Sequence, residues 1–165
     1  GKLILGLGNG FQILVELGIL PFVDFKKHIS FLPRNFNSWA YLSVQTTTPC
    51  IYTKGFQGMY LPLLSSYSFV YMEQQTFETL QKNNQLVLFY CDSTYKPLQP
   101  LEQSVCGICD ASGKIFGLLA HPEGYLHLYN HPQFHKLKLE GKLSRDWVSF
   151  QLFKNVVDYI KKFDS

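Results

Sequence analysis

The sequence predicts a single α/β domain. The expectation depends on a strand-turn-helix pattern at the start, a helical pattern near the end and β-rich residues in the middle. The chain opens with a short apolar run at residues 3–5, which meets a glycine-rich turn and then residues with helical spacing. Apolar residues also recur at helical spacing over 146–162. The middle is rich in β-branched and aromatic residues. Because 165 residues suffice for one core but not for two, we expect one unit over residues 1–165.

Composition excludes several classes of protein. Hydrophobic residues make up 46% of the chain and charged residues 16%, which is far from the composition of disordered proteins. The net charge is only +3 and the lysines are scattered, so nucleic-acid binding is not expected. No apolar run reaches the roughly 20 residues of a membrane helix, and no secretory leader is visible. We therefore expect a cytoplasmic protein with no membrane contact, whose four cysteines are reduced thiols.

The first predicted unit is a strand, a tight turn and a short helix. The strand covers 3–5 and the turn covers 6–10. Residues 11, 14, 15 and 18 then follow with the spacing of one face of a short helix, and Gly18 and Pro21 act as stop signals. A strand that is apolar on both faces usually lies inside a parallel sheet covered by helices. Its neighbouring strands must therefore come from elsewhere in the chain or from residues outside it.

The segment 22–71 has β character. Strands are expected around 38–45 and 59–64, interrupted by prolines, which fits edge strands or a small antiparallel layer. A short helix is expected over 76–82 and a buried strand over 85–90.

The last third of the chain predicts a hairpin and a helix. Residues 106–109 and 114–120 form the hairpin strands, joined by a turn at 110–113. The helix is expected over 146–162, with lysines placed favourably at its negative end.

Two groups of residues point to chemistry. The turn at 6–10 lies between a strand and a helix N-terminus, where one side chain is exposed to substrate and an anion is favoured. A cysteine there has a depressed pKa and acts as a nucleophile, but Gly8 has no side chain. The second group is His121-Pro122-Glu123. Because residues two apart in an extended segment point the same way, Glu123 can orient His121 as a general base.

Together these motifs carry a specific resemblance. The chain reads NGFQIL at 9–14, ELGILP at 16–21, CGICD at 106–110 and HPE at 121–123. It resembles the glutaminase component of phosphoribosylformylglycinamidine synthase, a class I glutamine amidotransferase. The resemblance spans nearly the whole chain, more weakly in the middle. It implies a flavodoxin-like three-layer sandwich with an antiparallel β insertion, from which the N-terminal β/α units of the family are missing.

The resemblance also implies a site and an activity. In the family a cysteine attacks the side-chain amide of glutamine, a histidine handles protons and a glutamate holds the histidine. The positions that correspond are Gly8, His121 and Glu123 for catalysis, and Asn9, Gly10 and Gln12 for substrate binding. The implied partners are glutamine and a synthetase subunit, which uses the ammonia to make formylglycinamidine ribonucleotide in purine biosynthesis. No cofactor and no metal are implied.

Departures from the family predict impaired catalysis. Gly8 replaces the cysteine, and residues 63–68 replace the A-H-G-E-G stretch of the family. The motif H-P-E-R reads H-P-E-G, followed by an insert over 125–144. Loss of one oxyanion donor costs about 3 kcal/mol in the transition state, and loss of the nucleophile costs nearly all triad catalysis. We expect little or no glutamine hydrolysis; the alternative function is a non-catalytic scaffold or binding subunit that contacts a synthetase.

Other interpretations of these residues are weaker. The glycines of 6–10 lack the spacing of a dinucleotide fingerprint. Cys106 and Cys109 suggest a zinc or redox pair, but no second pair follows, so buried strand cysteines are favoured. Neither is expected to replace the missing nucleophile, because neither lies at a helix end. Three histidines recur every four residues, but Pro132 breaks the helix that would align them for a metal: His127, His131 and His135.

Overall fold

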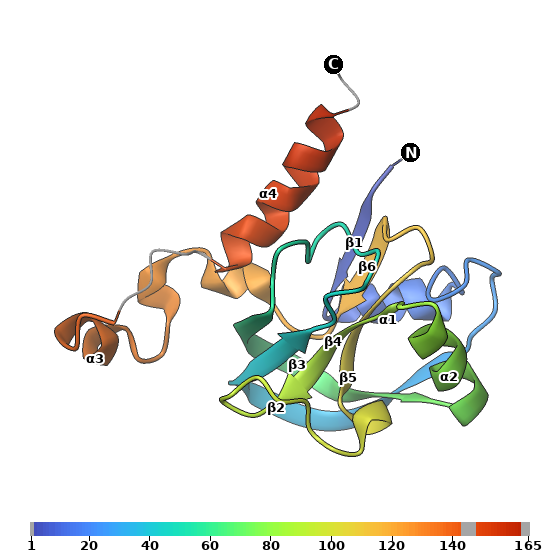
Figure 1. Cartoon of the computed structure of the whole chain (residues 1–165). Coiled ribbons are helices and arrows are strands. Elements are labelled where there is room, and N and C mark those ends of the chain that lie inside the picture. Colours follow the sequence, from blue (N-terminus) through green and yellow to red (C-terminus); the bar gives the residue numbers. More distant parts are fainter. Residues whose placement is uncertain (1, 143–147, 163–165) are drawn as a thin grey trace.

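The computed structural model describes residues 2–142 and 148–162 (Figure 1). Its strands are β1 (Ile4–Leu7), β2 (Ile29–Val44), β3 (Gly58–Met72), β4 (Leu86–Cys91), β5 (Val105–Cys109) and β6 (Ile115–Leu118). Its α-helices are α1 (Asn9–Glu16), α2 (Gln74–Lys82), α3 (Phe134–Leu139) and α4 (Val148–Lys161). Three short 3₁₀ helices complete the described elements: η1 (Leu101–Gln103), η2 (Pro122–Tyr125) and η3 (Leu128–Asn130).

The strands form one six-stranded sheet in the order β1-β6-β5-β4-β2-β3. β1 and β6 pair in parallel, and the other neighbours pair antiparallel. The predicted hairpin is confirmed as β5 and β6. The predicted antiparallel layer is confirmed as β2 and β3. The neighbour of β1 comes from much later in the chain, as its apolar character indicated, but the sheet around it is mixed rather than parallel.

The predicted ends of the two middle strands were wrong. β2 and β3 are much longer than 38–45 and 59–64, and Pro33 and Pro62 lie inside them. β3 is the outermost strand of the sheet, where a residue without an N–H is tolerated. Pro33 lies where the register between the two strands shifts. Prolines therefore mark an edge and an irregularity here, not strand ends.

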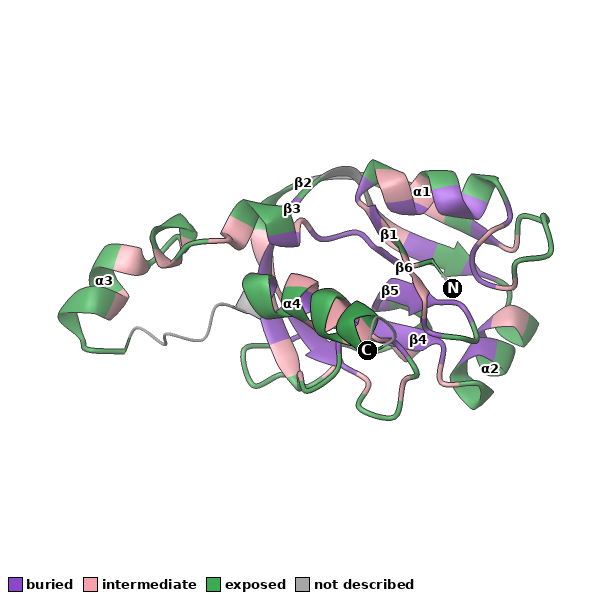
Figure 2. Ribbon diagram, turned by 90° about the horizontal axis from the view of Figure 1, so that it is seen from above, coloured by how far each residue is buried: buried purple, intermediate pink, exposed green. Residues whose placement is uncertain are grey.

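Helices cover both sides of the β1–β6 end of the sheet, with α1 on one side and α4 on the other (Figure 2). α1 packs through Phe11, which is fully buried and touches the sheet so closely that a Cβ at Gly117 would lie 2.1 Å from its ring. α1 ends before Gly18, whose φ of 62° suits the left-handed residue after a helix. The predicted three-layer α/β arrangement is confirmed.

The last helices differ in how they contact this body. α4 buries Leu152 completely and touches η2. It confirms the predicted C-terminal helix, of which residues 146 and 147 lie outside the described part. α3 projects away from the sheet (Figure 1), and Leu139 at its end is 89% exposed. No helix in the described ranges is long and apolar enough to cross a membrane.

Candidate functional site

Gly8 forms the turn between β1 and α1, as predicted. Its φ of 50° and ψ of −111° are values that side chains rarely allow, so glycine adopts them without strain. The Gly8 N–H donates to the carbonyl oxygen of Leu118 in β6 at 2.9 Å. The Gly8 carbonyl oxygen accepts from the N–H of Phe11 at 3.1 Å, which starts the helix. The backbone of a strand-to-helix elbow is therefore complete.

His121 and Glu123 follow β6 at the same end of the sheet. The His121 N–H donates to the carbonyl oxygen of Pro62 at 2.8 Å, which ties this segment to β3. The ring atom Nδ1 of His121 lies 2.7 Å from Oε1 of Glu123. The Glu123 side chain is 46% exposed, so this pair is partly screened by solvent. Its main effect is to orient the imidazole.

The structure brings Gly8 and His121 together. β1 and β6 are parallel, with Leu7 opposite Leu118, so their carboxyl ends meet at one edge of the sheet. A Cβ added to Gly8 would lie 2.6 Å from Cε1 and 2.7 Å from Nε2 of His121. The imidazole therefore lies directly against the Gly8 backbone, in the space that a side chain would need. The catalytic roles of these residues stay predictions.

The second ring nitrogen of His121 faces this contact. Within the described residues, Nε2 is buried and has no hydrogen-bond partner. In the neutral ring, the proton on Nδ1 is donated to the Glu123 carboxylate, which leaves Nε2 as an acceptor. This is the tautomer of a general base, held beside a backbone that has no group to deprotonate.

The residues predicted to bind substrate lie in the first turns of α1. Asn9 is exposed, and a Cβ on Gly10 would meet nothing within 4 Å, so this side of the helix start is open. Gln12 is half buried, and its Nε2 has no partner among the described residues. The three residues are thus adjacent to the elbow, and substrate binding by them stays a prediction.

The other candidates from the sequence lie elsewhere. Cys106 and Cys109 are buried in β5, away from any helix N-terminus, and burial raises the pKa of Cys106 well above its usual value. The histidines at 127, 131 and 135 do not converge, and no group of three possible ligands forms a metal site in the part of the chain that is described.

One feature of the surface was missed by sequence reasoning. His131 packs among three aromatic rings from separate segments, Trp39, Tyr60 and Tyr125, with ring centroids 5.3–5.8 Å from its own. Burial in this group lowers the pKa of His131. Aromatic residues at 39, 41 and 60 are visible in the sequence, but the partner segment is placed only by the fold.

Comparisons with known proteins agree with this geometry. The model of the CobB/CobQ-like glutamine amidotransferase domain matches residues 1–160. The chain is similar to the phosphoribosylformylglycinamidine synthase subunit PurQ of Methanococcus maripaludis strain S2, with 35% identity over 98% of this chain and 67% of the relative. The corresponding subunit of Dehalococcoides mccartyi is 30% identical over 98% of this chain and 65% of the relative.

A solved structure has the same fold. PurLQS from Thermotoga maritima contains a chain that superimposes with a TM-score of 0.63 at 23% identity, over 97% of this chain and 63% of that chain. This likeness concerns the fold alone. Relative to these proteins, the present chain spans about two thirds of their length.

Proposed function

Because the chain belongs to the CobB/CobQ-like glutamine amidotransferase family, we propose that it is the amidotransferase-type part of a phosphoribosylformylglycinamidine synthase. An active domain of this type hydrolyses glutamine and supplies ammonia for purine biosynthesis. The partners in this proposal are glutamine and the synthetase subunit, and the cytoplasmic location expected from the sequence belongs to the same proposal.

The proposal includes loss of the hydrolytic step in this chain, and one observation supports it. His121 and Glu123 are arranged as a base and its orienting carboxylate, but the backbone atom facing the base belongs to Gly8. Amide hydrolysis through a thioester needs a sulfur at that position, which His121 deprotonates and which then attacks the amide carbon. Without this sulfur, only the small acceleration of amide hydrolysis that binding and polarisation provide would remain.

The closeness of His121 to Gly8 sharpens this conclusion. A Cβ at 2.6 Å from the ring cannot be accommodated unless the imidazole moves. The ring is held by Glu123, so its movement also disturbs the pair at 2.7 Å. The positive φ of Gly8 adds strain for any residue with a side chain. A single return to cysteine is therefore expected to restore a reactive thiol before it restores efficient turnover.

The test measures ammonia release from glutamine, with the chain alone and with a synthetase partner. Wild type should release none above background. Gly8→Cys should react with an electrophilic glutamine analogue, because its thiol adjoins both His121 and the start of α1. Ile13→Cys is the matched control, since residue 13 lies in α1, close to the elbow in sequence, but is 58% exposed.

Two outcomes would overturn parts of the proposal. Ammonia release by wild type that disappears in His121→Ala would mean that another group acts as nucleophile. Equal labelling of Gly8→Cys and Ile13→Cys by the analogue would mean that the elbow offers no glutamine site.

A scaffold function is the second candidate, and the projecting part of the chain favours it. Tyr129 and Leu139 are 70% and 89% exposed on the segment that carries η3 and α3. Large apolar side chains on a projecting segment are typical of protein contacts. A scaffold predicts stable assembly with the synthetase without ammonia release, and loss of assembly in Leu139→Asp. If assembly is unchanged in Leu139→Asp and in Tyr129→Asp, the segment that carries η3 and α3 is not part of the interface with the synthetase.

A further inference from the structure

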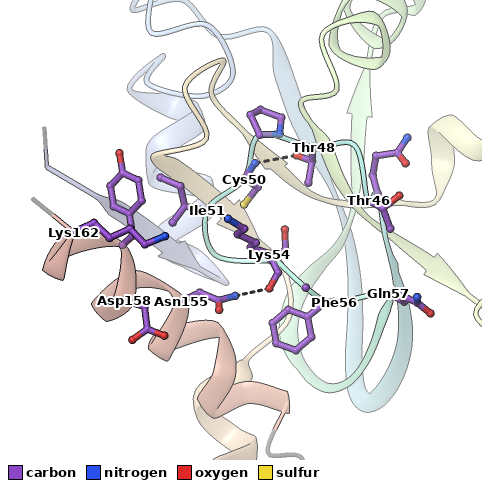
Figure 3. A pocket seen from close by; sticks show the side chains of 15 residues that line it. Thr46, Thr48, Cys50, Ile51, Lys54, Phe56, Gln57, Asn155, Asp158 and Lys162 are labelled. Atoms are coloured by element: carbon purple, nitrogen blue, oxygen red, sulfur yellow. Dashed lines mark hydrogen bonds between the residues drawn. The ribbon is translucent and has the colours of Figure 1, made fainter.

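A cavity of about 760 Å³ lies between the loop at 45–57 and helix α4 (Figure 3). The loop packs on the turn that precedes β6, since the N–H of Ile51 donates to the carbonyl oxygen of Gly113 at 3.1 Å. His121 follows the opposite end of β6. The cavity is therefore separate from the elbow described above.

The loop is fixed from two sides. A Cβ at Gly113 would lie 2.1 Å from the carbonyl oxygen of Pro49, so the loop and the turn are in close contact. On the other side, Nδ2 of Asn155 in α4 donates to the carbonyl oxygens of Tyr52 and Lys54, each at 2.9 Å. The second of these bonds is drawn in Figure 3. The wall of the cavity is thus held in one conformation.

Cys50 forms part of this wall, and Cys109 lies behind it. Cys50 lines the cavity and is 3% exposed, whereas Cys109 at the end of β5 is fully buried. The hydroxyl of Thr48 joins them: it accepts from the N–H of Cys50 at 3.3 Å and lies 3.7 Å from Sγ of Cys109. The side chains of Cys50 and Cys109 also interact with each other, since each shifts the pKa of the other.

The two thiols have opposite properties. Burial acts to raise the pKa of Cys50, but its interactions with Cys109 and with the backbone of Thr53 and Tyr52 hold it below its usual value. The interaction with Cys50, together with burial, raises the pKa of Cys109. Of the two thiols, Cys50 is therefore the one that ionises first. Two lysines and one carboxylate also line the cavity, Lys54, Lys162 and Asp158, so its net charge favours an anion.

We propose that Cys50 is an oxidation site for a small peroxide that enters this cavity, and that Cys109 is the resolving thiol. The Cys50 thiolate attacks one oxygen of hydrogen peroxide, the O–O bond breaks, and hydroxide leaves, which gives a sulfenic acid on Cys50. The Cys109 sulfur then attacks the Cys50 sulfur, and the sulfenic oxygen leaves as water. In total, two thiols are oxidised to one disulfide and one peroxide is reduced to two waters.

The disulfide would join the loop at 45–57 to the end of β5 covalently. This step uses no residue of the elbow, so it holds whether or not the chain hydrolyses glutamine. In a reducing cell the pair stays as thiols until an oxidant is present.

The experiment treats the folded chain with hydrogen peroxide and follows each cysteine by peptide mapping. A peptide that links Cys50 to Cys109 should form and should disappear on treatment with dithiothreitol. Cys50 should react at least about tenfold faster than Cys91 in the same molecule, because its neighbours lower the pKa of Cys50 whereas burial raises the pKa of Cys91. In Cys109→Ser the sulfenic acid should persist and be trapped on Cys50 by a cyclic 1,3-diketone.

Matched variants make the result decisive. Cys106→Ser, a buried β5 cysteine on the same strand as Cys109, should leave the linked peptide unchanged. Cys50→Ser should abolish both the link and the trapped adduct. Oxidation of Cys50 no faster than that of Cys91, a link between another pair, or a trapped adduct on Cys109 in Cys50→Ser would each overturn the proposal.

Discussion

The two ends of β6 present complementary halves of one kind of chemistry. After Leu118, the chain provides an imidazole and a carboxylate beside Gly8, which in the proposed function are a base and its carboxylate without a nucleophile. At the other end, before Ile115, the loop at 45–57 packs on the turn at Gly113 and provides Cys50, a thiol whose pKa is lowered by its neighbours. At both ends, backbone hydrogen bonds position the reactive segment, at Gly8 with Leu118 and at Ile51 with Gly113. The comparison therefore shows that the geometry of such a site can persist where a side chain such as that of a nucleophile is absent.

The elbow end depends most on Phe11, so its removal is the strongest way to break the comparison. Phe11→Ala should destabilise the chain by about 3–5 kcal/mol, because a fully buried ring between Phe31 and Gly117 is replaced by a cavity. Denaturant unfolding measures the change. Ile13→Ala, on the exposed face of α1, should change the free energy of unfolding by less than about 0.5 kcal/mol. Equal effects would mean that α1 is not packed on β6.

The thiol end is tested by the pH dependence of alkylation. The lowered pKa of Cys50 and the pKa of Cys91, raised by burial to about 11, predict half-maximal alkylation of Cys50 below pH 9.0 and of Cys91 near pH 11. Because the pKa of Cys50 is lower in the folded state than in the unfolded state, ionisation of Cys50 stabilises the fold. This stabilisation is complete above the unfolded-state pKa and is lost as the pH falls through the folded-state pKa. Coinciding pH midpoints for the two residues would contradict the lowered pKa of Cys50 at the thiol end.

The contact between the loop and the turn is tested by a pair of glycines with positive φ. Gly113→Ala should destabilise the chain by about 1–3 kcal/mol more than Gly55→Ala, because overpacking adds to a strain that both share. A Cβ at Gly113 meets the Pro49 carbonyl oxygen at 2.1 Å, whereas one at Gly55 meets nothing within 4 Å. Thermal unfolding measures the difference. Gly113→Ala should also expose Cys50 to faster alkylation. An unchanged alkylation rate would mean that the burial of Cys50 does not depend on the contact between the loop and the turn.

The smallest effect is expected at the ion pair. Glu123→Gln should lower the free energy of unfolding by less than about 1 kcal/mol, because a pair that is 46% exposed on one side is screened by water. Urea unfolding checks this value, with Glu140→Gln, which removes another partly exposed pair with Lys142, as the control. A loss several times larger than in the control would give Glu123 a structural role beyond orienting His121.

Local signals predicted the parts of the fold that lie close together in the sequence. The apolar run, the glycines and the helical spacing at the start predicted β1, the turn and α1. The turn at 110–113 predicted the β5–β6 hairpin, because a short turn between two strands leaves few alternatives. The ends of β2 and β3 escaped prediction, because whether proline is tolerated depends on the position of a strand in the sheet.

The proximity of the two motifs was predictable, whereas the roles of their residues stay predictions. The motifs at 9–14 and 121–123 suggested a shared site, and the parallel pairing of β1 with β6 places Gly8 against His121. The contact between Cys50 and Cys109 could not be foreseen, because it depends on a loop held by Gly113 and by α4. Nothing in the spacing of these two cysteines indicates it.

The conformation of Gly8 has a consequence for the thermal stability of the elbow. At a φ of 50° and a ψ of −111°, a residue with a side chain stores about 1–3 kcal/mol of strain, which an enzyme tolerates in exchange for an exposed nucleophile. Glycine releases that strain. Glycine at this position should thus give a melting temperature several degrees higher than a residue with a side chain would, since about 1 kcal/mol corresponds to roughly 2–4 °C in a domain of this size.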